Sequence, residues 1–169
     1  MDVLVRRILE LARIEATAPA RSSVQLPTFL AELASEYPAV TIDADDITLF
    51  VAPTQFASLV SNLLDNAIRH GGEQPVLIRA KAHENEVVIE IENHGDALPS
   101  NHFEQAFERF RTTERARGGT GLGLAIARAV AEAHGGRLTA HVLERGAMLQ
   151  AVFPLGPTAP ISGRRLPSV

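Results

Sequence analysis

Two asparagines one helical turn apart are the first residues in this sequence that suggest chemistry. Asn62 and Asn66 lie in segment 53–70, whose apolar residues recur at helical spacing, and His70 follows one turn later on the same side. Because asparagine is a poor helix former, two in register indicate carboxamides that serve a partner. An amide oxygen suits a hard cation such as Mg²⁺, and amide N–H groups or the Arg69 guanidinium suit phosphate oxygens. A polar, solvated helix face is the alternative interpretation.

A glycine-rich run that opens into a helix is the second candidate site. It reads Gly118-Gly119-Thr120-Gly121-Leu122-Gly123-Leu124. Glycines let the backbone approach an anion, and a helix N-terminus offers free N–H groups at the positive end of the dipole, so the run predicts a phosphate cradle. It lacks the Lys-Ser/Thr ending of a P-loop and follows a loop, which excludes both the P-loop and the dinucleotide fingerprint. A flexible hinge is the alternative.

Two further segments lie between the asparagines and the glycine run. At the end of a predicted strand, the Asn93 side chain could hydrogen-bond an adenine edge, and Gly95 would let a ring approach the backbone. Segment 103–111 places three phenylalanines on one helical face, and its Arg109 and Arg111 could bring positive charge over a triphosphate. A plain strand-to-loop turn and ordinary core anchors are the alternatives.

The order of these four segments resembles that of the catalytic, ATP-binding domain of bacterial two-component sensor histidine kinases. That family shares the Bergerat α/β sandwich with gyrase, heat-shock chaperone and mismatch-repair ATPases. Residues 62–70, 93–97, 107–110 and 119–124 look like its N box, first glycine box, F box and second glycine box. The resemblance covers about residues 24–154, and residues 9–15 resemble the last turns of the family's dimerisation helix.

The resemblance implies a role for each matching residue. Asn62 would ligate Mg²⁺, Asn66 would contact the phosphates of ATP, and Arg69 would replace the usual lysine as a phosphate contact. His70 would lie beside the nucleotide, and Asn93 would face the adenine amino group. The remaining residues implied to line the nucleotide are Gly95, Ala97, Leu98, Phe107, Phe110, Gly119, Thr120, Gly121, Leu122, Gly123 and Leu124.

The sequence departs from the family pattern at several positions. Asn93 stands where the family usually has an aspartate, so the side chain can accept a hydrogen bond from adenine but carries no negative charge. Ala97 replaces a glycine, Arg111 replaces a common aromatic residue, and Thr112 replaces the usual arginine. The cation that the lid would bring to the transition state is left open among Arg109, Arg111, Arg115 and Arg117.

The family's phosphoacceptor motif, a histidine followed by an acidic residue, is missing from this sequence. The six histidines fall in the boxes, turns, lid or last helix and strand, and none has metal-ligand spacing. The resemblance therefore implies an ATP-binding catalytic domain that passes the γ-phosphoryl group to a histidine on a separate dimerisation domain. A response regulator would be the next partner, and the expected location is the cytoplasmic part of an inner-membrane sensor kinase.

Composition narrows the classes that remain. The 169 residues fit one domain. With 16 basic and 20 acidic residues the chain has a net charge of −4, which argues against nucleic-acid binding. The absence of cysteine excludes disulfides, thiolate zinc sites and a thiol nucleophile. No apolar run approaches bilayer-spanning length and the start lacks a secretion signal, so we expect no direct membrane contact. Two heptads at the start of the chain rarely hold a dimer, so we expect a monomeric fragment.

The elements predict an α/β two-layer sandwich, with a mixed, mainly antiparallel sheet of about five strands on three helices, and the resemblance implies an ATP lid. We expect a dimerisation-helix stump at 1–16, a linker at 17–23, the catalytic domain at 24–155 and a flexible tail at 156–169. Helices are predicted at 27–36, 53–70 and 122–134, and strands at 40–43, 47–51, 75–82, 86–92, 137–142 and 147–153.

Two other functions remain open. The domain could bind nucleotide or protein partners without phosphoryl transfer, as Asn93 and Ala97 suggest. It could also be an anti-sigma serine kinase or an ATPase of the same superfamily. The dimerisation-like helix followed by a linker favours a sensor kinase over both.

Overall fold

A mixed sheet carries the domain. The computed structural model describes residues 3–16, 20–71, 74–95, 107 and 121–156. Within these residues, five strands have the order β2-β4-β5-β7-β6, and only the β2–β4 pair is parallel. The parallel pair needs a long crossover, which β3 and α3 supply. The strands are β2 (Val40–Ala44), β4 (Val76–His83), β5 (Glu86–Asn93), β6 (Arg137–Val142) and β7 (Ala147–Pro154).

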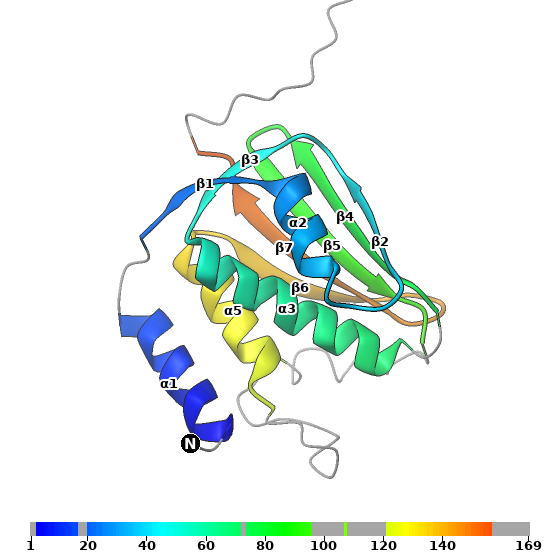
Figure 1. The fold of residues 1–169 in the computed structure, drawn as a ribbon, viewed down its shortest axis with the longest axis horizontal. Coiled ribbons are helices and arrows are strands. Elements are labelled where there is room, and N and C mark those ends of the chain that lie inside the picture. Colours follow the sequence, from blue (N-terminus) through cyan, green and yellow to red (C-terminus); the bar gives the residue numbers. More distant parts are fainter. Residues whose placement is uncertain (1–2, 17–19, 72–73, 96–106, 108–120, 157–169) are drawn as a thin grey trace, which may run out of the picture.

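Three helices cover one face of this sheet (Figure 1). They are α2 (Leu26–Ala34), α3 (Pro53–His70) and α5 (Gly123–Ala133). The predicted apolar stripe of α3 faces inward, since Phe56, Leu63 and their neighbours at helical spacing are fully buried. The two-layer α/β sandwich predicted from the sequence is thus confirmed.

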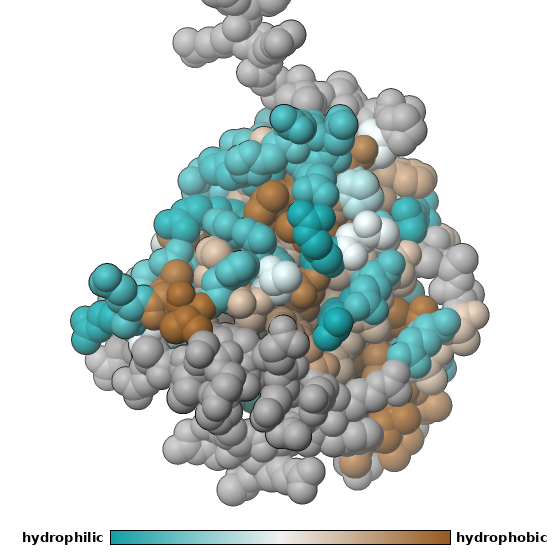
Figure 2. Space-filling view, turned by 180° about the vertical axis from the view of Figure 1, so that it is seen from behind, coloured by the Kyte–Doolittle hydropathy of each residue, from teal (hydrophilic) through white to brown (hydrophobic). Residues whose placement is uncertain are grey.

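Strand alternation separates the two faces of the sheet. Ile78, Ile89 and their alternating neighbours are buried under the helices. The opposite face is largely hydrophilic (Figure 2) and carries cross-strand pairs such as Arg79–Glu92, whose nitrogen and oxygen lie 2.6 Å apart. The sheet therefore has one core face and one solvent face.

The buried His134 connects the end of α5 to the start of α3. Its Nε2 accepts a hydrogen bond from the Ala52 N–H at 3.0 Å, and its Nδ1 lies 2.8 Å from the Val130 carbonyl oxygen. Because Nε2 is the acceptor, Nδ1 carries the proton and donates it to Val130. Burial lowers the pKa of His134, so the neutral ring is the form built into the core.

The N-terminal helix α1 (Val3–Ala16) packs beside α5 (Figure 1). Leu11 and Ile14 are buried against the core, whereas an apolar patch on the outer side of α1 is exposed (Figure 2). Its exposed members are Val3, Val5, Ile8 and Leu9. Among the described helices, none is both long and apolar enough to cross a bilayer.

The structure differs from the predicted elements near the start of the domain. A strand, β1 (Ser22–Gln25), begins inside the predicted linker and pairs antiparallel with β3 (Thr48–Val51) in a separate two-stranded sheet. The strands predicted at 40–43 and 47–51 both exist, but they belong to different sheets. Most of the predicted lid, and the predicted tail beyond residue 156, lie outside the described residues.

Candidate functional site

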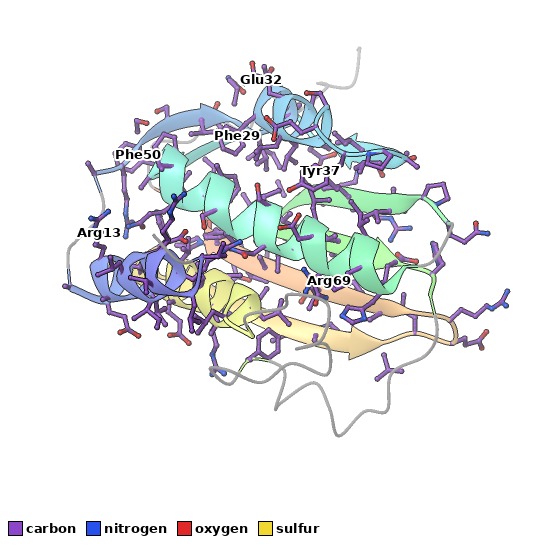
Figure 3. All side chains as sticks on the ribbon, turned by 60° about the horizontal axis from the view of Figure 1, so that its bottom comes forward. Arg13, Phe29, Glu32, Tyr37, Phe50 and Arg69 are labelled. Carbon is purple, nitrogen blue, oxygen red and sulfur yellow. The ribbon has the colours of Figure 1, made fainter. Side chains whose placement is uncertain are left out.

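One side of α3 carries the predicted polar residues. Asn62 is buried, Asn66 and His70 are partly exposed, and Arg69 is exposed. Figure 3 shows Arg69 on the side of α3 turned towards α5 and β6, whereas Phe29 and Tyr37 lie on the α2 side. The spacing from Asn62 to His70 corresponds to roughly 12 Å along the helix axis. The polar side of α3 is therefore long enough to run beside an extended ligand.

The start of α5 meets this side of α3 at Asn62. A Cβ added to Gly123 would lie only 3.0 Å from the Oδ1 of Asn62, so glycine permits the close approach. Gly121 has φ +67°, a conformation that glycine adopts without strain, and the buried Leu122 caps the helix. No side chain caps this N-terminus among the described residues, and the first N–H groups of an α-helix have no acceptor within the helix itself.

The other end of α3 meets the end of β5. A Cβ added to Gly95 would lie 1.7 Å from the carbonyl oxygen of His70, and one added to Gly71 would lie 3.3 Å from the Cβ of Asn93. Only glycine can therefore occupy position 95 in this packing. The structure brings the predicted N box and first glycine box together at one end of α3, and the second glycine box joins it at Asn62.

The carboxamide of Asn93 is already engaged by the protein. It is 4% exposed, its Oδ1 accepts a hydrogen bond from the Ala147 N–H at 2.9 Å, and its Nδ2 donates to the Ala67 carbonyl at 3.3 Å. These bonds join β5 to β7 and to α3. Asn93 thus has a structural role that its sequence position did not indicate, and one lone pair and one proton remain for a base.

The carboxamide of Asn62 is engaged as well, and its partners include residues that the sequence did not suggest. Its Nδ2 donates to the Ser58 carbonyl at 2.8 Å, and its Oδ1 accepts from Nη1 of Arg7 at 2.9 Å. Glu10 accepts a hydrogen bond from the Ser58 hydroxyl. Arg7 and Glu10 come from α1, more than forty residues away along the chain, so no local spacing could have revealed them.

Asn66 differs from Asn62 in its environment. Its side chain is partly exposed and has no hydrogen bond to any other described residue. A partly exposed amide oxygen on the polar side of a helix can bind a hard cation or accept a hydrogen bond. No group of three acidic or histidine side chains in the described residues could hold a metal by itself, so a cation here would depend on amide oxygens and on ligand phosphates.

Two more of the predicted site residues, Phe107 and Leu124, lie within the described part of the chain. Phe107 is described: it packs against the core, and the guanidinium carbon of Arg128 lies 5.9 Å from its ring centroid. Leu124 is partly buried in the first turn of α5. The predicted residues outside the described part of the chain are Ala97, Leu98, Arg109, Phe110, Arg111, Gly119 and Thr120.

Comparison with known proteins identifies the family. Residues 52–157 match the profile of the histidine kinase-, DNA gyrase B- and HSP90-like ATPases. The chain is 33% identical over 127 residues to the signal transduction histidine-protein kinase AfsQ2 of Streptomyces coelicolor, covering 72% of this chain and 24% of that protein. It is 35% identical over 124 residues to the sensor protein kinase WalK of Staphylococcus haemolyticus, covering 69% of this chain and 19% of WalK.

Solved structures show the same fold. Full-length ShkA in complex with AMPPNP superposes with a TM-score of 0.77 at 23% identity, covering 89% of this chain and 35% of ShkA. The catalytic domain of the histidine kinase ThkA gives a TM-score of 0.71 at 24% identity, covering 80% of this chain and 95% of that domain.

The chain therefore belongs to the histidine kinase-, DNA gyrase B- and HSP90-like ATPase family. Within it, the curated relatives place the chain among the ATP-binding catalytic domains of two-component sensor histidine kinases. The chain spans about a quarter or less of the length of the two relatives described above.

Proposed function

We propose that this domain binds Mg²⁺–ATP along the polar side of α3 and transfers the γ-phosphoryl group to a histidine on a separate dimerisation module. The observation that carries the proposal is the convergence on one helix. Asn62 lies against Gly123 at the start of α5, and Asn93 and Gly95 pack at the other end of the same helix. One extended ligand can then touch both ends.

Each end suits a different part of a nucleotide. The N-terminus of α5, with its first-turn N–H groups and positive dipole end, suits the phosphates. Asn66 and Arg69 add an amide and a guanidinium on the same side of α3. The remaining hydrogen-bonding capacity of Asn93, next to the glycine at position 95, suits the edge of a base.

The amide oxygens of Asn62 and Asn66 fit a magnesium ion, because Mg²⁺ prefers oxygen ligands and keeps several from water and phosphate. We assign Asn62 as the ligand of the magnesium ion and Asn66 as a contact to the phosphates of ATP. Because Asn66 is the less buried of the two and is unpaired among the described residues, it is the alternative ligand. When bound, the ion would neutralise negative charge that develops on the triphosphate.

The transfer itself requires little covalent work from this domain. An imidazole nitrogen of the acceptor histidine would attack the γ-phosphorus in line. A P–N bond forms while the bond to the oxygen bridging the β- and γ-phosphates breaks, and ADP leaves. The domain holds the triphosphate in place and surrounds it with N–H groups and cations, which is where most of the rate enhancement would arise. The lid cation stays a proposal among Arg109, Arg111, Arg115 and Arg117.

We place the domain in the cytoplasm, where ATP is available, as part of a longer sensor kinase. Its partners would be the dimerisation domain that bears the acceptor histidine and a response regulator that takes the phosphoryl group onto an aspartate. Nucleotide binding without transfer is the second candidate, and the prior engagement of both polar atoms of Asn93 favours it, since recognition of the base would be weakened.

The test is transfer of label from γ-labelled ATP to a separately purified dimerisation module. We expect acid-labile, base-stable label on that module with the wild-type chain, and almost none with Asn66→Ala or Asn62→Ala. Asn85→Ala, at an exposed turn, is the matched control and should transfer normally. Label on serine would contradict the proposal, and nucleotide binding with no label at all would support the second candidate.

A further inference from the structure

The N-terminal helix makes a specific polar contact with the proposed nucleotide site. Nη1 of Arg7 donates to Oδ1 of Asn62 at 2.9 Å, and the Ser58 hydroxyl donates to Glu10. Nη1 of Arg7 and Oε2 of Glu10 lie 3.7 Å apart, within one turn of α1. Their partners Asn62 and Ser58 lie one turn apart on α3, so one turn of α1 faces one turn of α3. The buried side chains of Leu11 and Ile14 hold α1 in this register.

This contact fixes the orientation of the Asn62 amide. Its Nδ2 is bonded to the Ser58 carbonyl at 2.8 Å, which leaves Oδ1 to point towards Arg7 and Gly123. Asn62 is 5% exposed, and Arg7 of α1 and Gly123 of α5 both lie against its Oδ1. Turning the amide over would place its NH₂ group against the guanidinium and break the bond to Ser58. The Oδ1 atom that would ligate a magnesium ion is thus already hydrogen-bonded to the positively charged guanidinium of Arg7.

A guanidinium and a magnesium ion compete at this oxygen. Magnesium would have to approach Oδ1 to about 2.0–2.1 Å, where it would be repelled both by Arg7 and by the positive end of the α5 dipole. Docking of α1 and full coordination by Asn62 are therefore coupled negatively. Because coupling is reciprocal, the bound cation would weaken docking as much as docking weakens binding.

We propose that α1 is a gate on this site: docked through Arg7 and Glu10, it withholds Asn62 from the Mg²⁺–nucleotide, and its release makes Asn62 available. The inference rests on the proposed nucleotide function. A signal that repositions α1 would change nucleotide affinity by shifting the population of the released form, with no change in the site's own residues.

The first test is calorimetric titration with AMP-PNP, in Mg²⁺ and in EDTA. The double variant Arg7→Met/Glu10→Gln removes both contacts and keeps the net charge, and Arg6→Met removes a neighbouring exposed arginine as the control. Loss of one charge-assisted hydrogen bond predicts affinity about tenfold tighter in Mg²⁺ for the double variant. Arg6→Met should match the wild type, and affinity in EDTA should differ little among the three.

Equal or weaker Mg²⁺-dependent binding by the double variant would overturn the gate. If the wild type and the double variant both bind no nucleotide under either condition, the proposed function itself fails, which separates the two conclusions.

The second test needs no change at the contact. Because the chain has no cysteine, spin labels at Ala12→Cys on α1 and Glu32→Cys on α2, both exposed, report only the distance between these helices. We expect a single narrow distance without nucleotide and a shifted or broadened one at saturating Mg²⁺–AMP-PNP. A distribution that stays the same at saturation would show that α1 remains docked and would refute the gate.

Discussion

Replacing Asn93 by alanine tests whether this residue holds the sheet to α3 before any nucleotide binds. The substitution leaves the Ala147 N–H and the Ala67 carbonyl without partners, and both groups face the buried end of β5. A buried group that loses its hydrogen-bond partner costs about 1–1.5 kcal/mol at the lower end of the usual range. Two such groups predict a loss of about 2–3 kcal/mol in the free energy of unfolding.

The assay is urea unfolding of the chain without nucleotide, followed by circular dichroism. The midpoint should fall while the m-value stays unchanged, because the surface exposed on unfolding is the same. For a chain of this length, the loss corresponds to a melting temperature lower by roughly 4–12 °C. Asn85→Ala, at an exposed turn, is the matched control and should change the free energy of unfolding by less than about 0.5 kcal/mol.

A loss below about 0.5 kcal/mol in Asn93→Ala would refute the reasoning, since the two bonds would then contribute nothing measurable. Asn93 would in that case be free to serve a nucleotide alone, as its sequence position suggested.

Three further predictions follow from the packing around α3. Gly123→Ala places a methyl group 3.0 Å from Oδ1 of Asn62, so we expect Mg²⁺–AMP-PNP affinity to fall about tenfold in calorimetry; unchanged affinity would be contrary to the proposed site. Gly95→Ala brings its Cβ to 1.7 Å from the carbonyl oxygen of His70, so its melting temperature should fall by at least several degrees, and a wild-type melting curve would show that the packing is wrong. Because burial lowers the pKa of His134, the unfolded chain takes up a proton at this residue before the folded chain does as the pH falls. The free energy of unfolding of the wild type should therefore be at its full value above pH about 6.5 and decline below it. His134→Gln should remove most of this pH dependence in urea titrations between about pH 7.5 and 5.5.

The sequence predicted the parts of the fold that rest on strong local periodicity. The stripe of α3 repeats over 18 residues, and β5 alternates cleanly, so both were recognisable without tertiary information. Strand β1 was missed because its four residues, Ser-Ser-Val-Gln, contain one apolar side chain, and its pairing with β3 joins segments far apart in the chain. Short strands of this kind are defined by their partner more than by their own residues.

The candidate site shows the same division. The order of the four boxes located Asn62, Asn93 and Gly123, because residue type and spacing are local properties of the chain. Which partners those side chains have is not local. The Arg7 contact to Asn62 spans 55 residues, and the Ala147 contact to Asn93 spans 54, so both depend on how α1 and β7 dock.

A crystal structure of the chain with Mg²⁺ and AMP-PNP tests the central claim most directly. We predict phosphates between the Asn62–Asn66 side of α3 and the first turn of α5, with the adenine at the other end of the helix beside Asn93 and Gly95. A nucleotide bound elsewhere, or bound with its adenine at the start of α5, would contradict the assignment.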